Sequence, residues 1–232
     1  MERLKTLMFK KYHKRIFTYD LNNYSFVSIL QEIYQINNLS ELCKDKIVNE
    51  VCSFETDCQK PEIYTFYKSP LFETFVEEYH RFIKNEMQNV FPEEKFIIYQ
   101  TRPTIRVHEK NNLSVGEWHK DSQDKYFHYL NTANFYLPFT ELTETNTIWM
   151  CKNMNDNTNE IIEPILINQN QFTSNYLAGV LHGNKLNTSD KTRISIDFRI
   201  IPGSLYNESA MTHVSSSNRK LALGDYYSIL HF

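Results

Sequence analysis

The spacing of apolar residues changes near residue 95, and this change limits the chain to a few fold classes. From 71 to 90 apolar residues recur every three or four positions, as on one face of an amphipathic helix. Ser69-Pro70 precedes this stretch and Phe91-Pro92 follows it, which predicts where the helix begins and ends. A second helix is expected over 24–35. We expect both helices to cover a sheet.

After residue 95 the sequence consists of short runs typical of strands. The candidate strands are 96–100, 104–109, 116–120, 129–138, 147–152, 161–168, 176–181 and 192–201. Many short strands without alternating helices predict an antiparallel sandwich or jelly roll. The fold class is therefore α+β. We expect a single domain over 1–232, with a mainly helical part at 1–94, a β core at 95–202 and a C-terminal extension at 203–232.

Composition excludes several function classes. The formal net charge of −3 gives no support to a nucleic-acid partner or an acidic membrane surface. No stretch has the roughly 18 apolar residues of a membrane span, and the N-terminus has no secretory signal. The four cysteines, at 43, 52, 58 and 151, form no C-x-x-C pair. We interpret them as reduced thiols of a cytoplasmic protein rather than as a zinc site or disulfide framework. Sequence motifs of serine hydrolases and phosphate-binding loops are also absent.

One histidine has an acidic residue two places on, in the segment Trp118-His119-Lys120-Asp121. On a strand these two side chains point to the same face and can bind one cation. Taken alone, the pair is equally explained by an incidental ion pair at a strand end. A second histidine, His182, follows the predicted strand 176–181. Two histidines and one carboxylate on one face of a metal ion, with other positions open, are typical of mononuclear non-haem iron sites.

The predicted strand 192–201 has one apolar and one polar face. Arg193 and Ser195 begin the polar face, shortly after His182. A guanidinium binds a carboxylate through two parallel hydrogen bonds, and a neighbouring hydroxyl adds a further donor. The ordinary interpretation of such a face is that it meets water. Its place after the candidate ligand instead favours a carboxylate-binding site.

The order H-x-D, then His, then R-x-S resembles the Fe(II)/2-oxoglutarate-dependent dioxygenases of the double-stranded β-helix, or cupin-like jelly-roll, fold. The segments around Leu181-His182-Gly183-Asn184, 134–138 and 197–202 resemble the branch related to a streptomycin-biosynthesis hydroxylase. The resemblance covers about 95–202.

This resemblance implies that His119, Asp121 and His182 bind iron. It implies that Arg193 binds the distal carboxylate of 2-oxoglutarate, with Ser195 as a helper. The family uses O₂ and releases succinate and CO₂. Related halogenases have a small residue where this chain has Asp121, so the carboxylate favours hydroxylation, or a desaturation or cyclisation that begins in the same way.

Two further residues, Asn134 and Arg106, are expected to contact the co-substrate or the substrate. Arg106, together with Arg102, Lys120 and Arg199, could give the mouth of the barrel a basic lining. We therefore expect a small-molecule substrate, of amino-acid or aminosugar type, with a carboxylate or phosphate as one option for its charged group.

Two alternatives stay open at this point. One is a cupin-like metal enzyme that does not use 2-oxoglutarate, which would share the barrel and the histidines but would not need Arg193. The other is a non-catalytic β-sandwich that binds a glycan or peptide through its many Tyr and Phe side chains.

Overall fold

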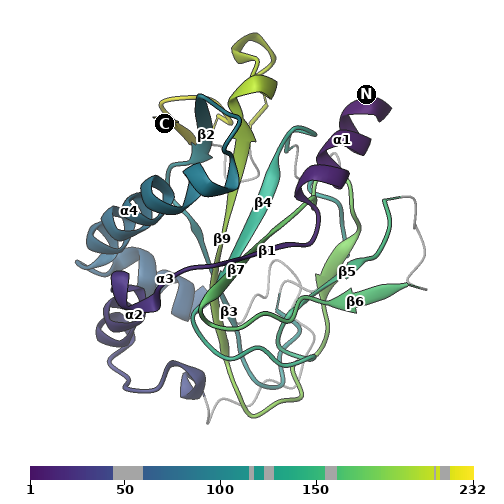
Figure 1. Ribbon diagram of the computed structural model, residues 1–232. Coiled ribbons are helices and arrows are strands. Elements are labelled where there is room, and N and C mark those ends of the chain that lie inside the picture. Colours follow the sequence, from purple (N-terminus) through teal and green to yellow (C-terminus); the bar gives the residue numbers. More distant parts are fainter. Residues whose placement is uncertain (44–59, 115–117, 123–127, 155–160, 212, 215–219) are drawn as a thin grey trace.

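The computed structural model describes residues 1–43, 60–114, 118–122, 128–154, 161–211, 213–214 and 220–232 (Figure 1). The α-helices are α1 (Glu2–Tyr12), α2 (Phe26–Tyr34), α3 (Lys60–Lys68) and α4 (Phe72–Val90). The strands are β1 (Arg15–Thr18), β2 (Phe96–Gln100), β3 (Thr104–His108), β4 (Ala133–Pro138), β5 (Ile148–Cys151), β6 (Ile162–Pro164), β7 (Gln171–Asn175), β8 (His182–Asn184), β9 (Arg193–Pro202) and β10 (Tyr227–His231).

The strands form two antiparallel sheets. The major sheet has the order β1-β7-β4-β9-β2-β10, and β3 also pairs with β9. The minor sheet has the order β6-β5-β8. The long central strand β9 pairs with β4 along one side, and with β3 and then β2 along the other. Side chains of β9 therefore occupy the middle of both faces of the major sheet.

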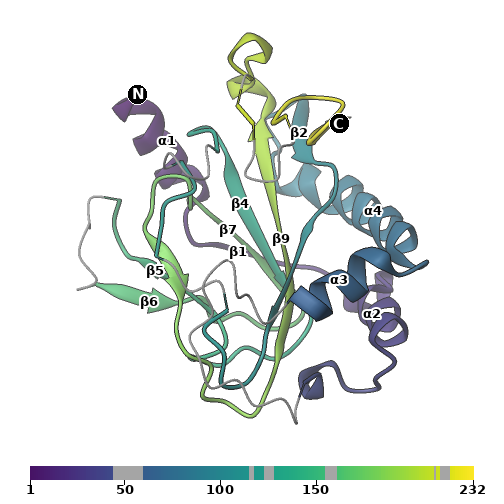
Figure 2. The same ribbon diagram turned by 180° about the vertical axis from the view of Figure 1, so that it is seen from behind.

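Helices α2, α3 and α4 cover one face of the major sheet and the minor sheet lies on its other side (Figures 1 and 2). Aromatic rings make the contact between the helices and the sheet. Tyr79 and Phe82 of α4 lie 5.3 and 6.3 Å from Phe198 of β9, measured between ring centroids. Phe82 also lies 5.2 Å from Phe172 of β7. This aromatic layer holds α4 against the two strands.

The two faces of β9 are as different as its sequence predicts. Ile194, Ile196, Phe198 and Ile200 are buried in the core that includes the helices. Because successive side chains of a strand alternate between faces, the polar residues from Arg193 to Arg199 point the other way, towards the minor sheet. A layer of charged side chains thus lies between the two sheets.

The predicted helices agree with the structure, with one shift. α2 lies within the predicted 24–35. α4 begins at Phe72 rather than at Ser69-Pro70, because the Ser69 side chain accepts a hydrogen bond from the Leu71 N–H (3.1 Å) and closes a turn before the helix. Strands were predicted at the positions of β2, β3, β4, β5, β6 and β9, several with longer bounds than observed.

The predicted strand at 176–181 is wrong. Residues 177–179 form a turn in which the N–H groups of Gly179 and Val180 donate to the Tyr176 carbonyl (3.3 and 3.1 Å). A side chain at Gly179 would meet the Tyr176 ring at 2.3 Å, so the turn requires glycine here. Strands β1, β7, β8 and β10 were not predicted, and β7 lacks the alternating apolar pattern of a strand because most of its buried residues are polar. The Thr173 and Ser174 hydroxyls donate to backbone carbonyls at the N-terminal end of the chain.

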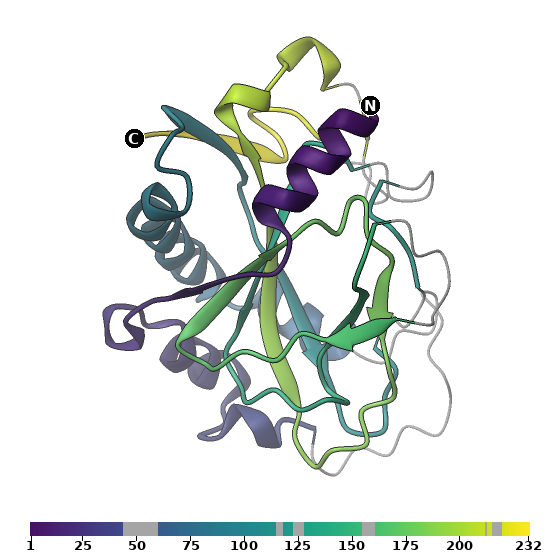
Figure 3. The ribbon, with the colours of Figure 1, turned by 45° about the vertical axis from the view of Figure 1, so that its right-hand side comes forward.

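The two ends of the chain supply strands at the two edges of the major sheet. β1 lies in the part predicted as mainly helical and pairs with β7. β10 lies in the C-terminal extension and pairs with β2. The segment that follows β9 lies at the same end of the molecule as α1 (Figure 3).

Two other predictions concern residues that lie partly outside the described part of the chain. Residues 116 and 117 of the predicted strand 116–120 lie outside it, and His119 forms a single bridge rather than a strand. Cys43 and Cys151 are thiols, whereas Cys52 and Cys58 fall outside the described part. None of the helices described is long and apolar enough to span a bilayer.

Phe75 tests the helix-to-sheet core. Its ring is fully buried on α4 between Phe26, Phe66 and Phe139. We predict that Phe75→Ala lowers the free energy of unfolding by about 3–5 kcal/mol, measured by urea denaturation, because a large cavity replaces the ring. The exposed Glu77→Ala on the same helix should change it by less than about 0.5 kcal/mol. A loss below about 1 kcal/mol for Phe75→Ala would contradict this packing.

Candidate active site

Backbone pairing brings the two predicted histidine ligands together. His119 and His182 form an antiparallel bridge in which each N–H donates to the other carbonyl, both at 3.0 Å. Their ring centroids lie 4.4 Å apart. The Asp121 N–H donates to the Leu177 carbonyl (3.1 Å), which anchors the backbone of Asp121 to the turn that precedes β8. Side chains far apart in the sequence therefore meet because their backbones are hydrogen bonded.

The three polar groups are spaced as metal ligands would be. Asp121 Oδ1 lies 3.4 Å from His119 Nε2 and 3.5 Å from His182 Nε2. The candidate ligand atoms all lie within 4.8 Å of one another. Three ligands at right angles, each about 2.1 Å from an ion, would be roughly 3 Å apart. A small inward movement would therefore complete one face of a coordination sphere.

His182 has the tautomer that ligation needs. Its Nδ1 lies 3.1 Å from the Val180 carbonyl, which can only accept, so Nδ1 carries the proton and Nε2 presents a lone pair. Burial lowers the pKa of His182 to about 4, which keeps the imidazole neutral. Such a hydrogen bond on the far ring nitrogen is the usual support of a metal-binding histidine.

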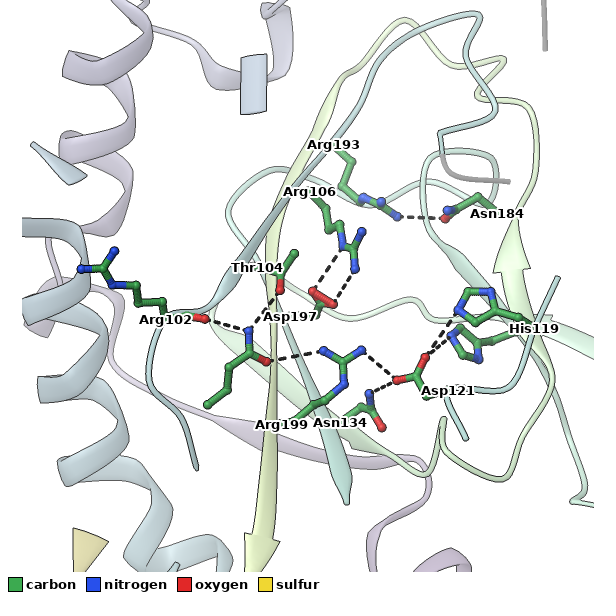
Figure 4. Close-up of polar contacts among 12 residues, drawn as sticks. Arg102, Thr104, Arg106, His119, Asp121, Asn134, Asn184, Arg193, Asp197 and Arg199 are labelled. Atoms are coloured by element: carbon green, nitrogen blue, oxygen red, sulfur yellow. Dashed lines mark hydrogen bonds and ion pairs between the residues drawn. The ribbon is translucent and has the colours of Figure 1, made fainter. Parts of the chain in front are cut away.

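The second oxygen of Asp121 is held by two donors. Oδ2 accepts from Asn134 Nδ2 (2.7 Å) and from Arg199 Nη2 (2.9 Å), as Figure 4 shows. Burial raises the pKa of Asp121, but the Arg199 guanidinium and the His119 hydrogen bond outweigh it, so the pKa lies well below its ordinary value. Asn134, expected at the co-substrate or substrate, thus supports a candidate ligand. Arg199 was not predicted to do so, although it shares the polar face of β9.

Arg193 is a buried cation that forms no ion pair with any carboxylate in the described part of the chain. Its side chain is 1% exposed. Its Nη1 donates to Asn184 Oδ1 at 3.4 Å and its guanidinium lies 5.9 Å from the centroid of the Tyr136 ring, whereas its Nε has no partner among the described residues. Burial lowers the pKa of Arg193 from its ordinary value. The buried Ser195 hydroxyl, two residues on, also has no partner there. These unused donors fit a bound carboxylate.

Arg106 is placed differently from Arg193. Its Nε and Nη2 donate to the two oxygens of Asp197 at 3.2 and 3.1 Å. Asp197 therefore neutralises the guanidinium and occupies two of its donors. The basic lining expected from Arg102, Arg106 and Arg199 is likewise reduced, because Arg102 pairs with Glu73 and Arg199 with Asp121.

The comparisons with known proteins agree with this arrangement. No model of a known protein family matches the chain. The chain is 27% identical over 214 residues to the streptomycin biosynthesis protein StrG of Streptomyces griseus, a match that spans 90% of this chain and 94% of StrG.

Two solved structures share the fold. SnoK from nogalamycin biosynthesis, described as a non-haem α-ketoglutarate-dependent carbocyclase, has a TM-score of 0.54 at 11% identity and covers 87% of this chain and 84% of its own. The nickel complex of the non-haem monooxygenase ThoJ has a TM-score of 0.51 at 11% identity, with 85% and 77% covered. The resemblance predicted from the motif is thereby confirmed: this chain has the fold of the Fe(II)/2-oxoglutarate-dependent oxygenases, brings an H-x-D…H set together, and is similar to StrG along nearly its whole length.

Proposed function

We propose that this chain is a non-haem Fe(II)/2-oxoglutarate-dependent oxygenase that hydroxylates a small polar metabolite of amino-acid or aminosugar type and releases succinate and CO₂. The observation that carries the proposal is the buried Arg193, which has no carboxylate partner among the described residues and contacts Asn184 of the strand that also carries His182. The C-terminal part of β9 also supports this cluster, through Arg199.

The residues present fit a divalent iron ion. Two imidazoles and one carboxylate converge from one side, and this ligand set is typical of mononuclear non-haem iron. Asp121 is ionised and His182 is neutral, so both are ready to ligate without losing a proton first. When bound, iron with 2-oxoglutarate and O₂ supplies the oxidising power for attack on a C–H bond.

The residues also fit 2-oxoglutarate. Its distal carboxylate would take the unused donors of Arg193 and Ser195, while its other end would reach the ion. Asn184 connects these two places, because it contacts Arg193 and follows His182 by two residues on β8. A buried cation without a partner costs several kcal/mol, and a ligand carboxylate would remove this cost. This favours the proposal over a cupin-like enzyme that does not use 2-oxoglutarate, for which Arg193 has no role.

The substrate should meet the ion pair of Arg106 and Asp197, which lies between Arg193 and Arg199 (Figure 4). Its side chains keep 33% and 15% of their surface exposed, more than Arg193 or Arg199. Because the pair is neutral as a whole, it favours a substrate with hydroxyl or amine groups over a strongly anionic one.

We further propose that the two sheets form a double-stranded β-helix and that 1–232 acts as one domain in the cytoplasm. The core at 95–202 would hold the catalytic residues, and the parts at 1–94 and 203–232 would support it. A non-catalytic β-sandwich is disfavoured, because a binding module gains nothing from two histidines that face a buried carboxylate, or from a buried arginine that has no carboxylate partner among the described residues.

Asp121 tests the metal site. We predict that Asp121→Ala lowers Fe(II) affinity at least 100-fold, measured by anaerobic titration, because it removes the anionic ligand. His231→Ala, which removes an exposed histidine on β10, should leave the affinity unchanged. Equal Fe(II) affinity of the two variants would refute this site.

Arg193 tests the co-substrate site. We predict that Arg193→Met, which nearly conserves the side-chain volume, abolishes the visible charge-transfer band that 2-oxoglutarate forms with Fe(II) in the absence of air, while iron binding persists. The same variant should raise the melting temperature of the ligand-free protein, because it removes a buried unpaired charge. A structural arginine would give the reverse, a lower melting temperature with 2-oxoglutarate binding intact.

The reaction itself is tested by succinate release from 2-oxoglutarate in the presence of a library of small polar metabolites. We predict that one hydroxyl- or amine-bearing compound stimulates release several-fold and gains one oxygen atom by mass. A product that loses two hydrogens instead would correct hydroxylation to desaturation or cyclisation. No stimulation by any class of compound, with 2-oxoglutarate bound, would argue against the proposed substrate class.

A further inference from the structure

The two oxygens of Asp121 have separate tasks. Oδ1 faces the Nε2 atoms of His119 and His182, at 3.4 and 3.5 Å. Oδ2 is turned away from them and accepts hydrogen bonds from Asn134 and Arg199. A carboxylate held in this way offers only Oδ1 to an ion.

We propose that Arg199 is a positioning residue that restricts Asp121 to ligation through one oxygen, and that the C-terminal extension fixes Arg199 through Tyr226. This inference rests on the proposed function, since it concerns the positions left for the co-substrate. An octahedral ion has six positions, of which the two histidines and one oxygen take three. The co-substrate needs two of the rest and O₂ needs one, so a second Asp121 oxygen would leave too few.

The guanidinium is itself held on its other side. Arg199 Nη1 lies 3.2 Å from the Tyr226 hydroxyl and 3.5 Å from Gln100 Oε1. Gln100 is fixed in turn, because its Nε2 donates to the Arg102 carbonyl (2.7 Å) and to the Thr104 hydroxyl (3.1 Å). Figure 4 shows the Arg199 guanidinium beside Asp121. A planar group with donors on two sides can bridge such partners, whereas a lysine ammonium cannot match this geometry.

The positive charge of Arg199 indicates that this residue orients Asp121 rather than strengthens metal binding. Arg199 Nη2 lies 2.9 Å from an oxygen of the candidate ligand, so its positive charge opposes a divalent cation and draws electron density from the carboxylate. If metal affinity were the only requirement, a neutral hydrogen-bond donor to Asp121 Oδ2 would serve better than a cation. Asn134 is such a donor and already binds the same oxygen. The cation therefore serves to hold the orientation of Asp121.

Water bound to Mn(II) tests the inference without the co-substrate. The relaxation rate of water protons reports how many water molecules a bound Mn(II) ion keeps. We predict that Arg199→Met releases Oδ2 to the ion, so that bound Mn(II) has two waters rather than three and its relaxivity falls by about a third. Mn(II) affinity should stay within about threefold of wild type, or increase, since chelation adds a bond and a repelling charge is lost.

The co-substrate gives the second measurement. In Arg199→Met we expect the dissociation constant of 2-oxoglutarate for the Fe(II) protein to rise at least tenfold. Tyr226→Phe removes one hydroxyl and should shift both measurements in the same direction by a smaller amount, so it carries the test if Arg199→Met does not fold. Arg3→Met, which removes an exposed guanidinium on α1, is the matched control and should change neither.

The outcomes separate this inference from the proposed function. Unchanged relaxivity and unchanged 2-oxoglutarate affinity in Arg199→Met would overturn the inference, as would a parallel loss of metal and 2-oxoglutarate affinity, which indicates damage to the whole site. A wild-type protein that binds Mn(II) but no 2-oxoglutarate would instead refute the proposed co-substrate, and the relaxivity of Arg199→Met would still decide the role of Arg199.

Discussion

The alternation of side chains along β9 is the constraint on which the rest of the structure depends. One face of this strand is apolar and joins the core beneath the helices. That packing fixes the register, since a shift by one residue would bury the charged side chains in the aromatic core. Arg193, Ser195, Asp197 and Arg199 are thereby held at regular intervals on the opposite face, between the two sheets.

Charge balance explains what each of these polar residues does. Arg199 is paired with Asp121, and Asp197 with Arg106, so these charges are compensated within the protein. Arg193 has no carboxylate partner among the described residues. The free-energy cost of burying its charge is offset only when a bound ligand supplies a carboxylate. The proposed co-substrate site is thus a place where the fold gives up stability so that an anion can bind in a fixed orientation.

The candidate site was largely predictable because its signals are local. The R-x-S pair needs only the two-residue repeat of a strand, which the apolar face of β9 supplied. The H-x-D pair was found by its residue types, although His119 forms a single bridge rather than a strand. That His119 would meet His182 followed from the family resemblance, not from spacing, because their contact is a backbone bridge between distant segments.

What could not be predicted depends on tertiary partners. β7 conceals its strand pattern because its buried polar residues bond to the backbone of the N-terminal segment, and 176–181 resembles a strand until Gly179 is seen against the Tyr176 ring. Arg106 and Arg193 look alike in the sequence, yet only Arg106 has an aspartate on the neighbouring strand. The roles of Asn134 and Arg199 likewise require the position of Asp121.

The central claim is that two imidazoles and one carboxylate hold a single iron ion whose open positions accept 2-oxoglutarate. X-ray absorption at the iron edge, recorded on the anaerobic protein with and without 2-oxoglutarate, tests it most directly. The account predicts one iron per chain with scattering from two imidazole rings, six-coordinate throughout, and a chelate of 2-oxoglutarate in place of bound water. An iron environment with fewer than two imidazoles, or one that 2-oxoglutarate leaves unchanged, would contradict it.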